Sequence, residues 1–281
     1  MRLIPAAAAA VAAMAGPAAA LTSFDQAVTP NVQLLFGLGN ANTAFTVDRA
    51  DNIEVGLRGK LRYDNSNAPN PGGPNGTYNS DGAGLYAFDP SDGIAPANRS
   101  LFNFDWSVNV NLDGTATDRF LADFTYLLSI DFDPTAAVGT VNGTDLIAFD
   151  PIGIGPGSPW DHGLGDNGST SPTVAKQYVA DDAAGGTGLL GEDYADAIQI
   201  YSVAQNSWNL GFYQPVGFDP QTEGLYTITL SVFGEGATPL ASASIDIRYG
   251  DVPQPVPVPA ALPLLAAGLA ALGLASSRRR G

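Results

Sequence analysis

Clustered aspartates are the residues of this chain whose type and spacing best suit metal chemistry. Asp131 and Asp133 are separated by a single residue, and Asp161 and Asp166 share a Gly- and Pro-rich stretch. Because Ca²⁺ prefers several carboxylate and carbonyl oxygens, these four residues are candidates for a structural calcium site. The sequence has no EF-hand loop, and Asp-Pro and Asp-Gly steps also serve ordinary turns. A solvated acidic rim is therefore the alternative interpretation, and no other cofactor is expected.

Residues for acid–base or nucleophilic catalysis are scarce. His162 is the only histidine, so a serine hydrolase would need it as its base. No Gly-x-Ser-x-Gly elbow occurs, and we expect His162 to be a loop residue that bonds to the backbone. A glycosidase needs two carboxylates across a sugar ring, yet no glutamate lies in a recognisable motif. Asp105 lies on the polar face of a predicted strand, where we expect its side chain to be solvated. The sequence therefore predicts a protein that is not an enzyme.

Aromatic residues could serve in carbohydrate binding if their rings are exposed. Trp106 and Trp208 fall on the apolar side of their predicted strands, so we expect both in the core. The candidates for exposed rings are Tyr78, Tyr86, Trp160 and Tyr213.

Composition and charge exclude several classes of protein. The chain has no cysteine, which excludes disulfides, thiolate nucleophiles and Cys-ligated metal centres. It has 12 basic and 28 acidic residues, a net charge of −16. Four of the basic residues lie at the extreme ends, so residues 21–251 carry a net charge of −20. Such a body repels phosphate backbones, and no nucleic-acid partner is expected.

Alternation of apolar and polar residues predicts the elements that position these groups. Residues 102–112 place six apolar side chains at every second position. The other segments with this pattern are 53–63, 85–88, 124–130, 208–212, 226–232 and 243–249. Period two indicates half-buried strands in antiparallel sheets with one face in water. Only residues 174–182 and 190–200 have a helix-like composition.

The predicted fold class is all-β. Turn-rich stretches separate the strands, and the body from residue 21 to 251 suits one antiparallel β-sandwich or jelly-roll-like domain. Two smaller sandwiches that divide within residues 155–171 are the alternative.

The N-terminal residues have the features of a secretory signal peptide. One basic residue, Arg2, precedes an apolar run over residues 3–14, and Ala18 and Ala20 supply the small side chains that signal peptidase reads. Residues 1–20 are therefore predicted to be removed after Ala20. A permanent N-terminal anchor is the alternative.

The C-terminal residues form three consecutive parts. Residues 252–259 are a proline-rich linker, residues 260–277 are an apolar segment, and residues 278–281 are a basic tail. An apolar helix over residues 260–275 would span about 24 Å, slightly less than a bilayer core. The arginines would stay cytoplasmic and leave the acidic body outside. A buried core helix is the alternative to this single transmembrane helix.

The order of these three parts resembles the PEP-CTERM class of bacterial sorting signals. The motif Val256-Pro257-Val258-Pro259-Ala260 is similar to the Val-Pro-Leu-Pro-Ala variant (VPLPA-CTERM) of alphaproteobacteria, and it departs only in Val258. The basic stop is Arg278, Arg279 and Arg280. The resemblance implies processing by an exosortase-type transpeptidase, transient residence in the inner membrane, and delivery to the cell surface or matrix. Residues 203–212 also resemble uncharacterised proteins of this class, which imply no activity.

These observations together predict an exported, non-enzymatic protein of the cell surface or extracellular matrix, associated with exopolysaccharide. Signal peptidase and an exosortase-type enzyme are its expected processing partners. The alternative is a calcium-assisted carbohydrate-binding module of the same exported class.

Overall fold

In the computed structural model, the described residues are 22–30, 34, 41–63, 77–135, 146–153, 162–169, 176–178, 192–212 and 214–252. A compact unit ends at Asp251, and residues 252–281 form a second unit. The predicted signal peptide, proline motif, apolar segment and terminal arginines lie outside the described residues. Within the described ranges, no helix combines the length and apolar character needed to cross a membrane.

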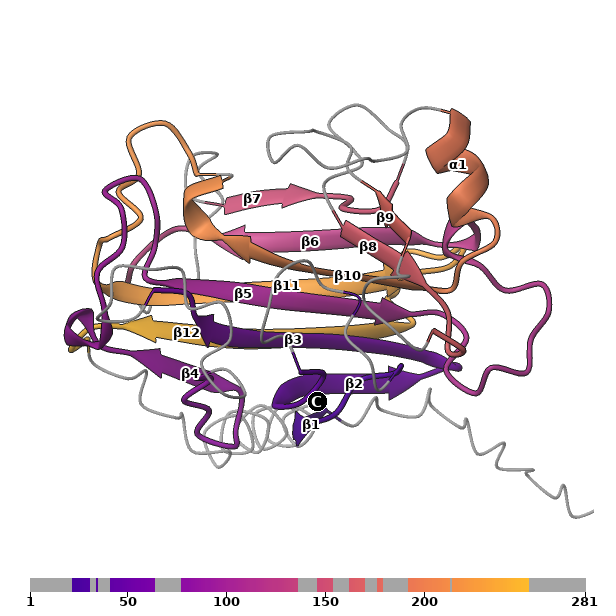
Figure 1. The fold of residues 1–281 in the computed structure, drawn as a ribbon, viewed down its shortest axis with the longest axis horizontal. Helices are drawn as coiled ribbons and strands as arrows, with labels where there is room; N and C mark the ends of the chain where they lie inside the picture. Colours follow the sequence, from indigo (N-terminus) through magenta and orange to yellow (C-terminus); the bar gives the residue numbers. More distant parts are fainter. Residues whose placement is uncertain are drawn as a thin grey trace, which may run out of the picture. The chain divides into compact units, whose positions relative to one another are not determined.

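The body is an all-β structure of two packed sheets (Figure 1). One sheet has the order β1 (Ser23–Gln26), β2 (Phe45–Ala50), β3 (Ile53–Leu61), β5 (Phe102–Asn109), β10 (Val203–Asn209), β8 (His162–Gly165) and β9 (Lys176–Tyr178). The other has the order β4 (Leu85–Phe88), β12 (Ala241–Tyr249), β11 (Gly224–Phe233), β6 (Thr125–Asp131) and β7 (Leu146–Phe149). The helical elements are α1 (Glu192–Ile198) and the 3-10 turns η1 (Pro90–Asp92), η2 (Leu121–Asp123) and η3 (Leu210–Phe212).

Strands from both halves of the chain share each sheet. β5 pairs with β10 through Trp106 opposite Asn206, and β6 pairs with β11 through Leu128 opposite Leu230. The proposed division within residues 155–171 therefore does not separate two sandwiches, because strands that precede it are hydrogen-bonded to strands that follow it in both sheets.

One strand pair departs from the predicted antiparallel arrangement. β4 runs parallel to β12, with Tyr86 opposite Ile247. A short hairpin would force two strands to be antiparallel, but a long stretch of chain separates these two and leaves their relative direction free.

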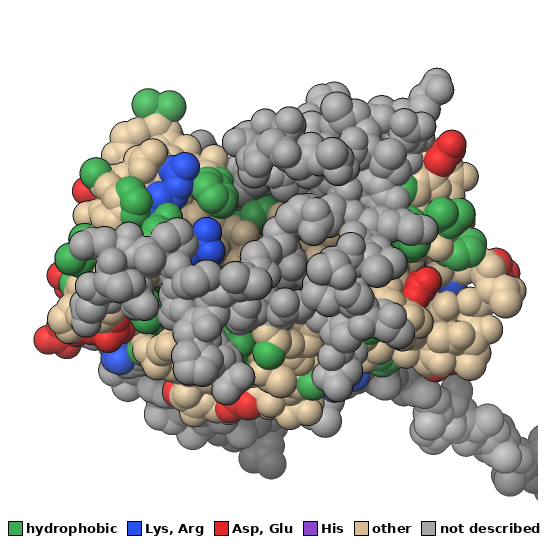
Figure 2. Space-filling model, in the orientation of Figure 1, with side chains coloured by type: hydrophobic (Ala, Val, Ile, Leu, Met, Phe, Trp, Pro, Cys, Tyr) green, Lys and Arg blue, Asp and Glu red, His purple; other side chains and the backbone are tan. Residues whose placement is uncertain are grey.

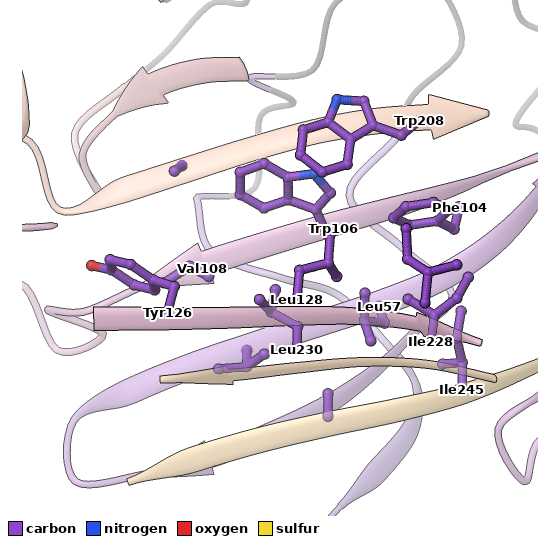
Figure 3. Close-up of a cluster of buried hydrophobic side chains, with 14 of the residues drawn as sticks. Leu57, Phe104, Trp106, Val108, Tyr126, Leu128, Trp208, Ile228, Leu230 and Ile245 are labelled. Atoms are coloured by element: carbon purple, nitrogen blue, oxygen red, sulfur yellow. The ribbon is translucent and has the colours of Figure 1, made fainter. Parts of the chain in front are cut away.

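The core lies between the two sheets. Trp106 and Trp208 are buried, with ring centroids 5.3 Å apart, and Phe104 contacts Trp208 edge to face at 6.0 Å. Figure 3 shows these rings against Leu128 and Leu230 of the opposite sheet. The prediction that Trp106 and Trp208 are core residues is confirmed, because period-two alternation places them on the inner face.

Proline and glycine lie in the turns that follow two of the strands. β4 ends at Phe88, and Asp89 then caps η1 by accepting a hydrogen bond from the Ser91 N–H, 2.8 Å long. Gly114, in the turn after β5, has a φ of +66°, which favours glycine.

α1 lies within the predicted helical stretch 190–200, whereas residues 174–182 contain strand β9. The pairing of β9 with β8 outweighs its helix-like composition.

Candidate functional site

The outer face of the seven-stranded sheet carries a buried layer of polar side chains. We call residues 27–30, 34 and 41–44 the N-terminal cover, because their backbone binds this layer. The Thr29 N–H donates to Glu54 Oε1 (2.6 Å), and the Leu34 N–H donates to Gln205 Oε1 (2.9 Å). The polar layer comprises Glu54, Arg58, Lys60, Asn103, Asp105, Ser107, Asn109, Gln205 and Asn209, all buried. The prediction of a wet outer face is wrong for these residues, all of which are buried, and the cover contacts several of them.

Asp105 lies at the centre of this layer. Its Oδ2 pairs with Arg58 Nη2 at 2.7 Å, and its Oδ1 lies 3.6 Å from Lys60 Nζ. The Arg58 guanidinium lies between the rings of Phe45 and Tyr78, 4.2 and 4.3 Å from their centroids. Arg58 also donates to carbonyl oxygens of the cover at Ala41 and Thr43. The expectation that Asp105 is solvated is therefore wrong.

The protonation of this cluster follows from its burial. Burial by itself would raise the pKa of Asp105, but Lys60 and Arg58 outweigh it and hold that pKa below its ordinary value. Burial lowers the pKa of Lys60, an effect that Asp105 opposes. Both side chains of the Arg58–Asp105 pair have 0% exposure, so the carboxylate cannot reach a dissolved substrate. The cluster joins the cover to the sheet.

Glu54 forms a second contact between sheet and cover. Its Oε2 pairs with Arg49 Nη2 at 2.6 Å, and Arg49 also donates to the Ala27 carbonyl oxygen at 2.7 Å. Burial raises the pKa of Glu54, although the Thr29 N–H and Arg49 both oppose the increase.

Replacing Glu54 with Gln should change how stability depends on pH. Because its pKa is raised, the folded protein holds this proton more tightly than the unfolded chain does. The charged carboxylate therefore destabilises the fold at neutral pH, and that penalty disappears as the pH falls. As the pH falls from about 7 to about 4, just below the ordinary pKa of a glutamate, the wild type should gain stability relative to Glu54→Gln, as measured by urea unfolding.

The exposed Glu235→Gln variant is the matched control for this comparison. An equal stability difference between wild type and Glu54→Gln at both pH values would show that the buried carboxylate does not titrate as described.

His162 is a buried core residue of β8, so the prediction that it lies in a loop is wrong. Its Nε2 lies 3.0 Å from the Tyr194 hydroxyl, which donates to the Ile152 carbonyl oxygen at 2.6 Å. Its ring centroid lies 5.7 Å from that of Trp106. Pairing of β8 with β10 carries this segment into the sheet, and the histidine links α1 to the core.

The calcium candidates occupy two turns. Asp131 ends β6, and its Oδ1 accepts the Asp133 N–H at 2.9 Å. Asp166 follows β8, and its Oδ1 accepts the Gly168 N–H at 2.8 Å. The two strands end at opposite sides of the sandwich in Figure 1, so these turns do not meet. Asp161 lies outside the described residues.

Acidic side chains do not form a metal-binding group in the described ranges. These residues contain no group of three or more His, Cys, Asp or Glu side chains that could hold a metal ion. On the face drawn in Figure 2, the coloured acidic side chains are scattered rather than gathered in one patch. The carboxylates of Asp131 and Asp166 instead stabilise local turns.

The aromatic candidates for sugar binding have different environments. Tyr86 is fully buried, and its hydroxyl donates to the Ala44 carbonyl oxygen at 2.9 Å. Burial raises the pKa of Tyr86 to about 12. Tyr78 is half-buried against Arg58, while Trp160 and Tyr213 lie outside the described residues. The expectation of an exposed Tyr86 is wrong, because β4 turns this ring toward the core.

A pocket of about 590 Å³ lies where α1 meets η2, β6 and β7. Its lining residues are Leu121, Ala122, Phe124, Thr125, Tyr126, Ala148, Phe149, Asp150, Ile152, Gly153, Ala195, Ile198 and Gln199. Sequence reasoning missed this site, since its apolar residues have the pattern of core positions and its polar residues belong to no motif.

The chain matches no protein-family model, and neither the comparison with curated proteins nor that with solved structures found a match. The candidate sites are therefore argued from their own geometry.

Proposed function

We propose that this chain is an exported, non-enzymatic protein of the cell surface or extracellular matrix, delivered by a PEP-CTERM-type sorting tail. One observation carries the proposal, namely the order of proline motif, apolar segment and arginine cluster over residues 252–281. The compact unit ends at Asp251, directly before that motif. This boundary supports a tail that is appended to a separately folded body.

In this proposal residues 1–20 are the signal peptide, residues 21–251 are a jelly-roll-like carrier domain, and residues 260–277 anchor the precursor in the inner membrane. Signal peptidase and an exosortase-type enzyme process the two ends. The anchored precursor is then released to the surface or to exopolysaccharide.

The body has properties that suit an extracellular environment. It contains no cysteine, so its stability does not depend on the redox state of the compartment. Its buried carboxylate Asp105 is paired with two cations within the fold. The net charge of −20 on residues 21–251 also favours solubility.

The sorting proposal predicts that the mature protein lacks both ends. Intact-mass analysis of protein recovered from its native cell surface should show loss of residues 1–20 and of the apolar segment that begins at Ala260. Replacing Arg278, Arg279 and Arg280 with Glu should release the precursor from membrane fractions, because cytoplasmic positive charge orients an apolar helix.

A triple Arg→Lys variant at the same three positions keeps the charge and is the matched control. Recovery of surface protein that still carries residues 260–281 would contradict cleavage, and equal membrane retention of the Glu and Lys variants would contradict the role of charge.

A further inference from the structure

Two loops at one end of the sandwich expose large apolar side chains. The loop between β4 and β5 exposes Ile94 (56%), while η3 and the loop after it expose Phe212 (50%) and Val216 (107%). We call these three residues the loop patch. In the described part of the chain only Leu127, on β6, and Ile200, just after α1, are large apolar residues of similar exposure. The exposed apolar surface is therefore concentrated at one end, as it is where a protein meets a partner or a membrane.

Hydrogen bonds join the two loops into one surface. Gln221 Nε2 donates to the carbonyl oxygens of Ala95 and Pro96, at 3.2 and 2.9 Å. The Leu210 N–H donates to Ser100 Oγ at 3.3 Å. The loops lie side by side at the left of Figure 1, and Figure 2 shows hydrophobic side chains at the same end. The loop patch is therefore held in place as a unit.

Arg99 adds a cation to the loop patch. Its guanidinium carbon lies 4.7 Å from the centroid of the Phe212 ring, and its Nη1 donates to the Asn98 carbonyl oxygen at 2.8 Å. The ion pairs among the described residues do not include Arg99. A guanidinium group that has no carboxylate partner can bind the phosphate oxygens of lipid headgroups.

The chain leaves the body at the base of the same two loops. The Gly250 N–H donates to the Phe88 carbonyl oxygen at 2.9 Å, directly before the first loop. The Asp251 N–H donates to Glu223 Oε2 at 3.3 Å, at the end of the second loop. The parallel pairing of β4 with β12 brings these chain ends together.

The length of the linker determines which end of the body can reach a membrane. Residues 252–259 span at most about 28 Å, even when fully extended. β11 has ten residues, so the sandwich is about 33 Å long in that direction. A body that is attached to a bilayer at residue 260 can therefore bring the loop patch to the membrane surface more readily than the opposite end.

We propose that the loop patch docks on the lipid bilayer while the precursor is anchored there. Ile94 and Val216 enter the headgroup region, and Arg99 bonds to headgroup phosphates. The inference rests on the proposed membrane anchor and adds an orientation of the body. The contact is weak by itself, but a short tether gives an effective concentration in the range of about 1 mM. Cleavage removes the tether, so the mature body leaves the membrane.

Acids at the same end show that net charge does not drive this docking. Burial raises the pKa of Tyr249, and the nearby carboxylates of Glu223, Asp89, Asp219 and Asp92 add to the increase. These carboxylates would repel an anionic membrane. Docking therefore depends on the apolar side chains, and it should occur on zwitterionic phosphatidylcholine.

The test uses the precursor, reconstituted through its own apolar segment into phosphatidylcholine vesicles and isolated with them by flotation. Because the chain has no cysteine, Ala97→Cys or Thr117→Cys provides a single position for a fluorophore. Both positions are exposed, and they lie before and after β5, hence at opposite ends of the body. Lipids with a nitroxide in the headgroup region quench a fluorophore that reaches the membrane surface.

The fluorophore at position 97 should be quenched, and the fluorophore at position 117 should not. Adding Ile94→Ser and Val216→Ser should lower the ratio of docked to undocked protein by about tenfold or more, because two apolar side chains are lost from the contact. Leu127→Ser with Ile200→Ser is the matched control, since it removes the same kind of exposed residue elsewhere, and quenching should not change.

Equal quenching at positions 97 and 117 would overturn the proposal, as would equal quenching in the two double-serine variants. If lipid leaves the fluorophore at position 97 unquenched while polygalacturonate changes its emission, the loop patch binds an acidic glycan and docking on lipid is wrong. A precursor that floats with vesicles but shows no quenching contradicts docking alone. A precursor that does not float contradicts the proposed anchor, and docking with it.

Discussion

Asp105→Ala is expected to lower the free energy of unfolding by about 3–5 kcal/mol, because it leaves buried cations without their carboxylate. Arg58 Nη2 lies 2.7 Å and Lys60 Nζ lies 3.6 Å from the carboxylate oxygens of Asp105. Both cations are buried and remain without a carboxylate partner in this cluster once that charge is removed. Urea unfolding followed by circular dichroism measures the effect.

The matched control is Asp118→Ala, an exposed aspartate for which a change close to zero is expected. A triple variant, Arg58→Met, Lys60→Met and Asp105→Leu, should recover much of the lost stability, because apolar residues of similar volume replace the whole charged cluster. If Asp105→Ala changed the free energy of unfolding as little as Asp118→Ala does, the result would indicate that the polar layer is hydrated in solution.

Trp106→Ala is expected to cost about 3–5 kcal/mol through loss of buried surface and formation of a cavity. Trp106 has 0% exposure. Its ring contacts Trp208 in the next strand and His162 in β8, with centroids 5.3 and 5.7 Å away. Its removal therefore loosens the contact between three strands, and thermal unfolding should show a large decrease in melting temperature.

Phe212→Ala is the control for this substitution, since Phe212 is an aromatic residue with 50% exposure. The melting temperature of the Phe212→Ala variant should decrease much less than that of Trp106→Ala. Similar decreases in melting temperature for Trp106→Ala and Phe212→Ala would contradict the assignment of the inner face of β5.

Most of the longer strands were predictable because they carry a periodic signal of their own, whereas β1, β2, β7, β8 and β9 were not predicted. β3, β4 and β5 lie within the segments that alternate, β6, β11 and β12 overlap theirs, and α1 lies within one of the two helix-like stretches. The inward side of Trp106 and Trp208 followed from the same alternation, since successive side chains of a strand point to opposite faces. Local sequence was sufficient for these features.

The environment of the outer face was not predictable in this way. Alternation assigns Arg58 and Asp105 to the face opposite the core, but it does not reveal that another segment covers that face. The cover binds the polar layer through contacts such as Thr29 to Glu54, which join residues far apart in sequence. A polar residue under such a cover has the same periodicity as one in water.

The sequence by itself determined the strands that alternate clearly, their core face and the acidic character of the body, because local alternation and composition encode them. Only the tertiary structure decided that Asp105 and His162 are buried, that β4 runs parallel to β12, and that a pocket opens beside α1. These features depend on which distant segments meet. The free energy of a charge or an aromatic ring is set by those neighbours, and the spacing of residues along one strand does not specify them.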